Sequence, residues 1–138
     1  MKSHAAVLAK KGEPLKIVDV EVADPGAGQV RVKVEACGIC RSDLHIIDTG
    51  EGVTFPCVLG HEAAGVVESV GAGVTTLKAG DRVILSWTPA CGVCPLCLRG
   101  QPQLCRKLAM STGNKGPLST GGKSLDSFMG LGAFCRHV

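Results

Sequence analysis

Residues 17–36 of the chain read IVDVEVADPGAGQVRVKVEA, and this stretch indicates two β-strands with a turn between them. Val30, Val32 and Val34 alternate with charged residues, which is the period of a half-buried strand. Residues 17–22 alternate in the same way, and the Asp-Pro-Gly sequence between the two runs is typical of a turn. The N-terminal third of the chain therefore favours strands.

The same pattern continues outward from this stretch. Apolar runs at residues 63–70 and 82–87 adjoin glycine-containing turns, whereas only residues 40–49 indicate a helix, which is short. Many short strands joined by glycine and proline turns, with little helix, favour a small β-barrel or sandwich. We therefore expect a mainly β fold in a single domain, residues 1–138.

The final third of the chain differs in character. Residues 91–107 are rich in cysteine and irregular in pattern, and residues 111–127 predict a polar, glycine-rich loop. Residues 133–138 begin another strand-like run, within which the sequence stops. Such an abrupt stop is what we expect of part of a longer protein.

Composition and charge exclude several classes of protein. Hydrophobic residues make up 45% of the chain and charged residues 20%, which excludes disorder over its whole length. The net charge is only +3, with Lys and Arg dispersed and aromatic residues scarce, so we expect no nucleic-acid partner. The apolar stretches fall far short of the roughly 20 residues of a membrane span, so we expect no membrane contact. Without a secretory signal at the N-terminus, we expect a cytoplasmic protein with reduced cysteines.

Four of the eight cysteines stand in one short segment, residues 91–105. Their spacing is C-x2-C-x2-C-x7-C, and four thiolates this close in sequence can surround one tetrahedral zinc ion. Arg99, Arg106 and Lys107 would offset the negative charge of such a site. The spacing predicts a structural zinc lobe whose ligands are Cys91, Cys94, Cys97 and Cys105.

An iron–sulfur cluster and disulfides are the alternatives for these cysteines. The bacterial ferredoxin run begins similarly, but its fourth cysteine follows after three residues and precedes a proline. Here seven residues intervene, and Arg106 follows Cys105. A closed four-cysteine site leaves no open coordination position, so its expected role is structural.

A second group of possible ligands is spread over residues 40–62. Cys40, His61 and Glu62 are the ligand types of a catalytic zinc site, in which one position stays open for substrate. Each residue alone is a weak signal, because a single histidine is more often structural and a buried cysteine usually packs as a small apolar residue. Spacing alone leaves both interpretations open.

Four motifs in order along the chain, together with the cysteine lobe, resemble a known family. They are Gly38-Ile-Cys-Arg-Ser-Asp43, Gly60-His-Glu-Ala-Ala-Gly-Val-Val67, Val70-Gly-Ala-Gly-Val74 and Gly80-Asp-Arg-Val83. Over nearly its whole length the chain resembles the N-terminal catalytic domain of zinc-dependent medium-chain alcohol dehydrogenases. The resemblance implies a GroES-like, partly open β-barrel with a short helix and a four-cysteine zinc lobe.

The resemblance implies a role for each residue of the second group. Cys40 and His61 would be ligands of a catalytic zinc ion, and Glu62 would lie beside it as a ligand that exchanges with water. Asp43 would accept a hydrogen bond from His61 and so fix its tautomer.

Four further residues acquire roles from the same resemblance. Ser42 would take the alcohol proton, and His45 would form the outer end of that relay through the cofactor ribose. Arg41 would contact the cofactor pyrophosphate, and Trp87 would form a wall of the substrate pocket that favours small alcohols or aldehydes. The alternatives are helix capping by Ser42 and Asp43, a solvated surface charge at Arg41, and core packing by Trp87.

The activity implied is hydride transfer between a zinc-bound alcohol and the nicotinamide of NAD(P). The sequence does not contain the cofactor-binding half, because no G-x-G-x-x-G run is followed by a βαβ unit of about 30 residues. In the family a further cysteine, the third protein ligand of the catalytic zinc, lies downstream of the matched region. Cys135 is the candidate to replace it. We expect this chain to hold catalytic zinc weakly and to lack dehydrogenase activity on its own.

The alternative function is a non-catalytic, zinc-binding GroES-like module, or an engineered scaffold on that barrel. Such a module would keep the lobe at residues 91–105 and perform no chemistry. A truncated barrel would also expose apolar surface, through which the chain could self-associate.

Overall fold

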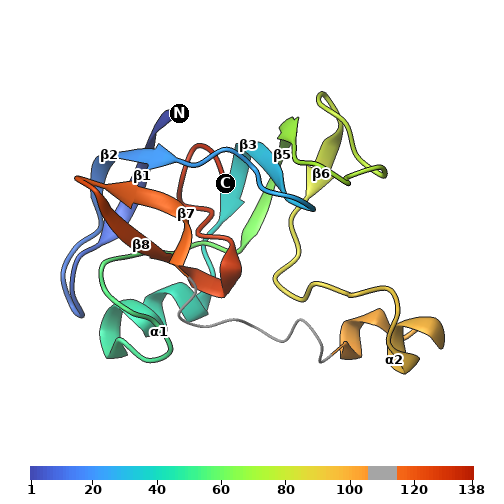
Figure 1. Cartoon of the computed structure of the whole chain (residues 1–138). Coiled ribbons are helices and arrows are strands. Elements are labelled where there is room, and N and C mark those ends of the chain that lie inside the picture. Colours follow the sequence, from blue (N-terminus) through green and yellow to red (C-terminus); the bar gives the residue numbers. More distant parts are fainter. Residues whose placement is uncertain (106–114) are drawn as a thin grey trace.

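The computed structural model describes residues 1–105 and 115–138, in which β-strands are the main regular elements (Figure 1). The strands are β1 (Lys2–Leu8), β2 (Lys16–Val22), β3 (Val30–Gly38), β4 (Cys57–Val58), β5 (Glu62–Val70), β6 (Arg82–Ile84), β7 (Lys115–Thr120) and β8 (Lys123–Ser127). The helices are α1 (Arg41–Thr49), α2 (Pro95–Leu98) and the short 3-10 turns η1 (Pro102–Leu104) and η2 (Phe128–Gly130). The mainly β fold with a short helix is confirmed. None of the helices among these residues has the length and hydropathy needed to cross a membrane.

The strands form a barrel and a separate sheet. The barrel closes in the order β1-β2-β7-β8-β4, with β4 pairing back onto β1, and the second sheet has the order β3-β5-β6. The expected barrel is therefore present, and its five-stranded ladder closes beside the three-stranded sheet.

Residues 133–138 join the barrel to the sheet. They hydrogen-bond to β1 on one side and to β3 on the other, which gives this run the extended form that its sequence predicted. The bonds include Ala6 N–H to Phe134 O (2.8 Å), Arg136 N–H to His4 O (3.0 Å) and Val138 N–H to Val32 O (3.0 Å).

The structure corrects the expectation of a loop at residues 111–127. Residues 106–114 lie outside the described part of the chain, but β7 and β8 form an antiparallel pair within the barrel. Leu118 and Leu125 are buried there, and glycine, proline and serine around them hide the strand period in the sequence. The cysteine-rich segment is likewise less irregular than expected, since it contains α2 and η1.

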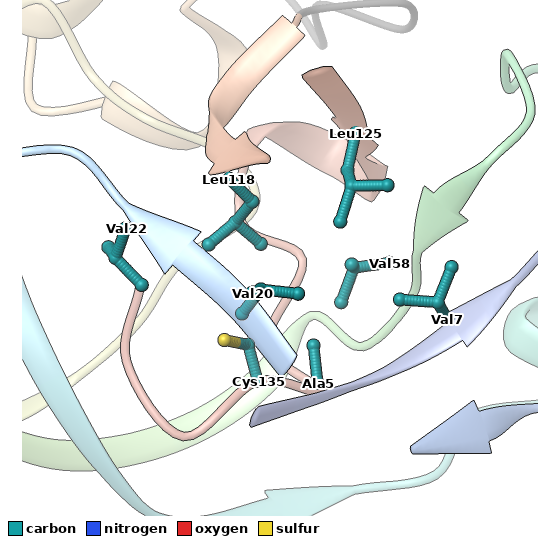
Figure 2. Packing of buried hydrophobic residues seen from close by; sticks show 8 residues of the cluster. All are labelled: Ala5, Val7, Val20, Val22, Val58, Leu118, Leu125 and Cys135. Carbon is teal, nitrogen blue, oxygen red and sulfur yellow. The ribbon is translucent and has the colours of Figure 1, made fainter. Parts of the chain in front are cut away.

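Two apolar clusters hold the fold together. The first fills the barrel and is drawn in Figure 2: Ala5, Val7, Val20, Val22, Val58, Leu118, Leu125 and Cys135. The second comprises Leu8, Ile46, Cys57, Leu59 and Phe128, so it connects the barrel with α1 and η2. Each fully buried valine or leucine contributes about 1.5–3 kcal/mol relative to an exposed one.

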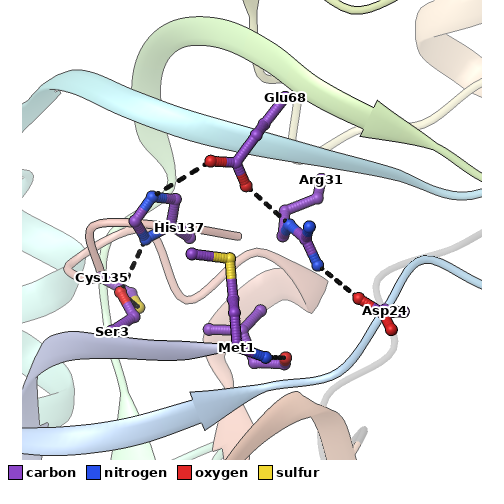
Figure 3. Close-up of polar contacts among 8 residues, drawn as sticks. Met1, Ser3, Asp24, Arg31, Glu68, Cys135 and His137 are labelled. Atoms are coloured by element: carbon purple, nitrogen blue, oxygen red, sulfur yellow. Dashed lines mark hydrogen bonds and ion pairs between the residues drawn. The ribbon is translucent and has the colours of Figure 1, made fainter.

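A polar network crosses from β1 to the three-stranded sheet (Figure 3). Ser3 Oγ lies 2.8 Å from His137 Nδ1, and His137 Nε2 lies 3.8 Å from a carboxylate oxygen of Glu68. Arg31 donates to the other oxygen of Glu68 at 2.8 Å and to Asp24 at 2.9 Å. Burial lowers the pKa of His137, and this effect outweighs the opposing attraction of Glu68.

Candidate metal centres

Two groups of possible metal ligands form among the described residues. In each group the ligand atoms all lie within 4.8 Å of one another. One group is Cys91, Cys94, Cys97 and Cys105, and the other is Cys40, His61 and Glu62. The structure thus brings together both sets that the sequence singled out.

Short helical turns place the four cysteines of the lobe. Cys94 precedes α2 with Pro95 at its first position, and Cys105 directly follows η1. The sulfurs of Cys94 and Cys97 are 3.5 Å apart, and those of Cys94 and Cys105 are 3.9 Å apart. Four sulfurs at about 2.3 Å from a tetrahedral zinc ion are about 3.8 Å from one another. The cluster fits a zinc site at close to its final spacing.

The pKa values of two thiols in this cluster shift in opposite directions. The backbone N–H of Cys97 donates to Cys94 and lowers the pKa of that thiol, whereas desolvation raises the pKa of Cys97 to about 11. A divalent cation would displace these protons, because thiolates are the binding form. Arg99 lies within the lobe, while Arg106 and Lys107 lie outside the described residues.

Strand register brings Cys40, His61 and Glu62 together. Gly38, the last residue of β3, pairs with Glu62, the first residue of β5. Cys40 lies just beyond the end of β3 as the N-cap of α1, and His61 directly precedes β5. Segments about twenty residues apart in sequence therefore meet at one end of a strand pair.

Two glycines make this close approach possible. A Cβ at Gly38 would lie 2.6 Å from Glu62 Oε2, so the carboxylate passes over residue 38. Gly60 has φ +88°, and a Cβ there would lie 2.5 Å from Phe134 Cδ1 and 2.7 Å from its backbone nitrogen. Glycine is required at residue 60 on both grounds.

Asp43 ties the two segments together through their backbones. It is 1% exposed and accepts from Cys40 N–H at 2.9 Å and from Gly60 N–H at 3.0 Å. The bond to Cys40 belongs to a capping box at the start of α1, as the capping alternative proposed. His61 Nδ1 lies 3.5 Å from Asp43 Oδ1, which is longer than an ordinary hydrogen bond. Asp43 is thus beside His61, and the direct bond expected between them is not formed in this geometry.

The residues assigned to proton and cofactor handling lie on α1. Ser42 Oγ is 3.3 Å from His61 Nε2. His45 is exposed and its Nε2 lies 3.2 Å from a carboxylate oxygen of Glu51. Arg41 is exposed at the start of the helix. Their roles in catalysis stay predictions.

A pocket of about 540 Å³ opens beside this group of ligands. Its lining includes His61, Glu62, Ala63, Leu85 and Trp87. Trp87 is 41% exposed and its ring centre lies 6.5 Å from that of His61, edge to face. This exposure argues against the alternative that Trp87 only fills the core.

At two positions the structure differs from what the sequence predicted for the site. Phe128 packs edge to face on His61 with ring centres 5.4 Å apart, and no motif indicated it. Cys135 is buried in the barrel cluster, 3.8 Å from Ser3 Oγ, and is not a member of either ligand group. It does not replace the missing cysteine ligand, because its position in residues 133–138 directs its thiol into the barrel.

Comparisons with known proteins converge on one family. A family model described as "Alcohol dehydrogenase GroES-like domain" matches residues 26–138. An alcohol dehydrogenase zinc-binding domain protein from Burkholderia ambifaria is 36% identical, with a TM-score of 0.90 over 99% of this chain and 39% of its own. Benzyl alcohol dehydrogenase from Acinetobacter calcoaceticus is 31% identical, with a TM-score of 0.83 over 99% of this chain and 38% of its own. A cobalt- and zinc-bound thermostable alcohol dehydrogenase from Pyrobaculum aerophilum is 30% identical, with a TM-score of 0.76 over 100% of this chain and 39% of its own. The chain spans about two fifths of the length of these structures.

Proposed function

Because this chain belongs to the alcohol dehydrogenase GroES-like domain family, we propose that it is the catalytic-domain part of a zinc-dependent alcohol dehydrogenase that uses NAD(P). One observation carries the proposal. A thiol, an imidazole and a carboxylate converge within 4.8 Å, and two of the three, His61 and Glu62, line an open pocket.

The donor set of this second group fits a zinc ion. Thiolate, imidazole and carboxylate are all zinc ligands, and three protein ligands with an open fourth position are typical of catalytic sites. Cys40 and Glu62 together would balance the two positive charges of the ion. The missing Cβ at Gly38 leaves the Glu62 carboxylate room beside Cys40 and His61.

The residues of α1 suit the handling of a proton. A bound zinc ion would supply the Lewis acidity that lowers the pKa of an alcohol hydroxyl, and nicotinamide would accept the hydride. Ser42 would accept the hydroxyl proton, since its Oγ lies 3.3 Å from Nε2 of His61, a residue of the ligand group. His45 lies one turn further along α1, where its exposed ring could release the proton to solvent.

The pocket supports a small, uncharged substrate. Ala63, Leu85 and Trp87 give it apolar walls, and its volume of about 540 Å³ suits small alcohols or aldehydes. We assign the exposed Arg41 to the cofactor pyrophosphate. Because the metal-binding thiols must stay reduced, we place the protein in the cytoplasm.

A domain exchange tests the proposal. Residues 1–138 would replace the matching domain of the Burkholderia ambifaria protein, and NAD(P)H formation would be followed with small primary alcohols. We expect alcohol-dependent reduction that Cys40→Ser abolishes, while the 138 residues alone show none. A folded, zinc-loaded fusion without activity would contradict the proposal, and so would activity that survives Cys40→Ser.

A second candidate function is a zinc-binding module without catalysis, which could also self-associate. It is favoured by the complete four-cysteine cluster, beside a second group with only three members in the described chain. Zinc content of EDTA-washed protein separates the two functions. A single zinc ion that Cys94→Ser removes would support the module, and a second ion that Cys40→Ser removes would support the enzyme domain.

A further inference from the structure

His61 is buried, yet hydrogen bonds do little to fix its ring. The side chain is 4% exposed, and its Nδ1 makes no hydrogen bond among the described residues. Asp43 Oδ1 is 3.5 Å from that nitrogen, and the other nitrogen faces Ser42 at 3.3 Å. Because Nδ1 is buried against Asp43, we take Nε2 as the ligand nitrogen, and its contact with Ser42 would be given up when a metal binds. The orientation of the ring must therefore come from packing.

Two aromatic rings pack against His61, and they differ in how firmly they are held. Phe128 lies 5.4 Å away at an interplanar angle of 84°, and Trp87 lies 6.5 Å away at 88°. Phe128 is 5% exposed and belongs to the cluster with Ile46 and Leu59, whereas Trp87 is 41% exposed. Phe128 is the closer ring and the one anchored in the core.

The residue directly after Phe128 has an unusual backbone conformation. Met129 has φ +54° in the left-handed region, which costs about 1–3 kcal/mol for a residue other than glycine. The turn is closed by hydrogen bonds from Leu131 N–H (3.0 Å) and Gly132 N–H (3.2 Å) to Phe128 O. The fold keeps a strained residue directly after the ring that contacts His61.

We infer that Phe128 is a positioning residue, which holds the imidazole plane of His61 in the orientation that lets Nε2 join Cys40 and Glu62 around a metal ion. The inference rests on the proposed metal site. It assigns Phe128 a task that ordinary core packing does not include, because the apolar cluster could be filled by an aliphatic side chain of similar size.

Loss of the ring should appear as weaker metal binding. In Phe128→Leu the imidazole of His61 would sample other orientations. The entropy lost when the ring is fixed would then oppose metal binding. Ordering one such side chain corresponds to roughly a 2- to 10-fold loss of affinity. Ile46→Val is the matched control, since it removes apolar volume from the same cluster without removing a ring.

Cobalt(II) is the probe for this experiment. The full 138-residue chain first receives one equivalent of zinc for the four-cysteine cluster, which favours zinc over cobalt, and is then titrated with cobalt. The visible absorption that disappears in Cys40→Ser belongs to the second site. We expect weaker cobalt binding there in Phe128→Leu and unchanged binding in Ile46→Val. Equal affinities in Phe128→Leu and the unsubstituted chain, or an equal loss in Ile46→Val, would overturn the inference.

A second measurement needs no metal. Histidine NMR spectra should show one sharp set of ring signals for His61 in the unsubstituted chain and shifted, broadened signals in Phe128→Leu. Phe128→Met serves the same purpose if the leucine variant unfolds. Unchanged His61 signals would overturn the inference about Phe128 alone. Failure of the unsubstituted chain to bind cobalt at Cys40 would overturn the proposed metal site and the inference with it.

Discussion

Asp43 connects the two segments of the candidate site through hydrogen bonds. Its two oxygens accept the backbone N–H groups of Cys40 and Gly60, which belong to segments far apart in the sequence. The carboxylate is buried, so each of these donors would be left without a partner if an oxygen were lost. Asp43 therefore joins the loop that carries one possible ligand to the loop that carries the others.

Asp43→Asn tests this connection. An amide keeps one oxygen but presents an NH2 group to the second N–H donor, so we expect a loss of about 1–3 kcal/mol in the free energy of unfolding. Urea unfolding measures it. Asp48→Asn is the control, because Asp48 is an exposed residue of the same helix. Equal losses in the two variants would show that Asp43 does not tie the segments together.

Gly60→Ala tests the close approach behind His61. The variant combines a positive φ with a Cβ only 2.5 Å from Phe134, so we expect a loss of about 2–4 kcal/mol in the free energy of unfolding. Gly12→Ala is a matched control, since Gly12 has φ +73° and nothing within 4 Å of the added Cβ. It should cost about 1–2 kcal/mol from the backbone alone. Thermal unfolding of both variants measures these losses, and the difference between them gives the effect of the steric contact. Equal losses would mean that the structure around residue 60 shifts to accommodate the added Cβ.

The lobe at residues 91–105 is an element without a core of its own. Neither α2 nor η1 contributes a buried residue, and the lobe stands apart from the barrel in Figure 1. A segment that buries so little apolar surface must be stabilised by something else, and four sulfurs at zinc-site spacing supply the means.

Metal removal should therefore open the lobe and leave the barrel intact. Under EDTA, or in Cys97→Ser, we expect faster hydrogen exchange in peptides from the lobe and unchanged exchange in β1 and β2. Cys37→Ser is the control, because Cys37 lies outside both ligand groups. Exchange that rises equally in the barrel would show that the lobe supports the whole fold, and no rise at all would argue against a stabilising metal.

Alternation predicted strands where valine marks the buried face, as in β2 and β3, whereas β5 was expected from a continuous apolar run. It failed for β1, where Ser3 and Ala5 occupy buried positions and are too small or polar to mark a face. It failed again for β8, in which Asp126 and Ser127 are buried. A sequence pattern predicts elements only where burial and hydrophobicity coincide.

The same limit applies to the candidate site. Ligand chemistry and spacing singled out Cys40, His61 and Glu62, because the residue types themselves carry the signal. The contact of Phe128 with His61 depends on tertiary packing between residues far apart in the chain, and nothing in the local sequence indicates it.

At the scale of the whole molecule, His137 lies where the barrel meets the sheet. Its ring contacts Ser3 of β1 and Glu68 of β5, while its backbone bridges to Lys33 of β3. The positive charges of Arg31, Lys33 and Arg136 oppose protonation, and burial opposes it more strongly. A neutral ring can accept from Ser3 at Nδ1 and donate from Nε2 toward Glu68. A charged ring would have to donate to Ser3 instead.

The junction between barrel and sheet should consequently weaken in mild acid. Burial lowers the pKa of His137 from its ordinary value of 6.5, so the unfolded chain binds the proton first as the pH falls. The contribution of His137 is complete above about pH 6.5 and is lost progressively below it, down through the lowered pKa of the folded state. Urea unfolding between pH 7.5 and pH 5 should show a shallower loss of stability in His137→Gln, which cannot titrate, than in the unsubstituted chain. Parallel pH profiles for His137→Gln and the unsubstituted chain would show that the junction does not sense the protonation of His137.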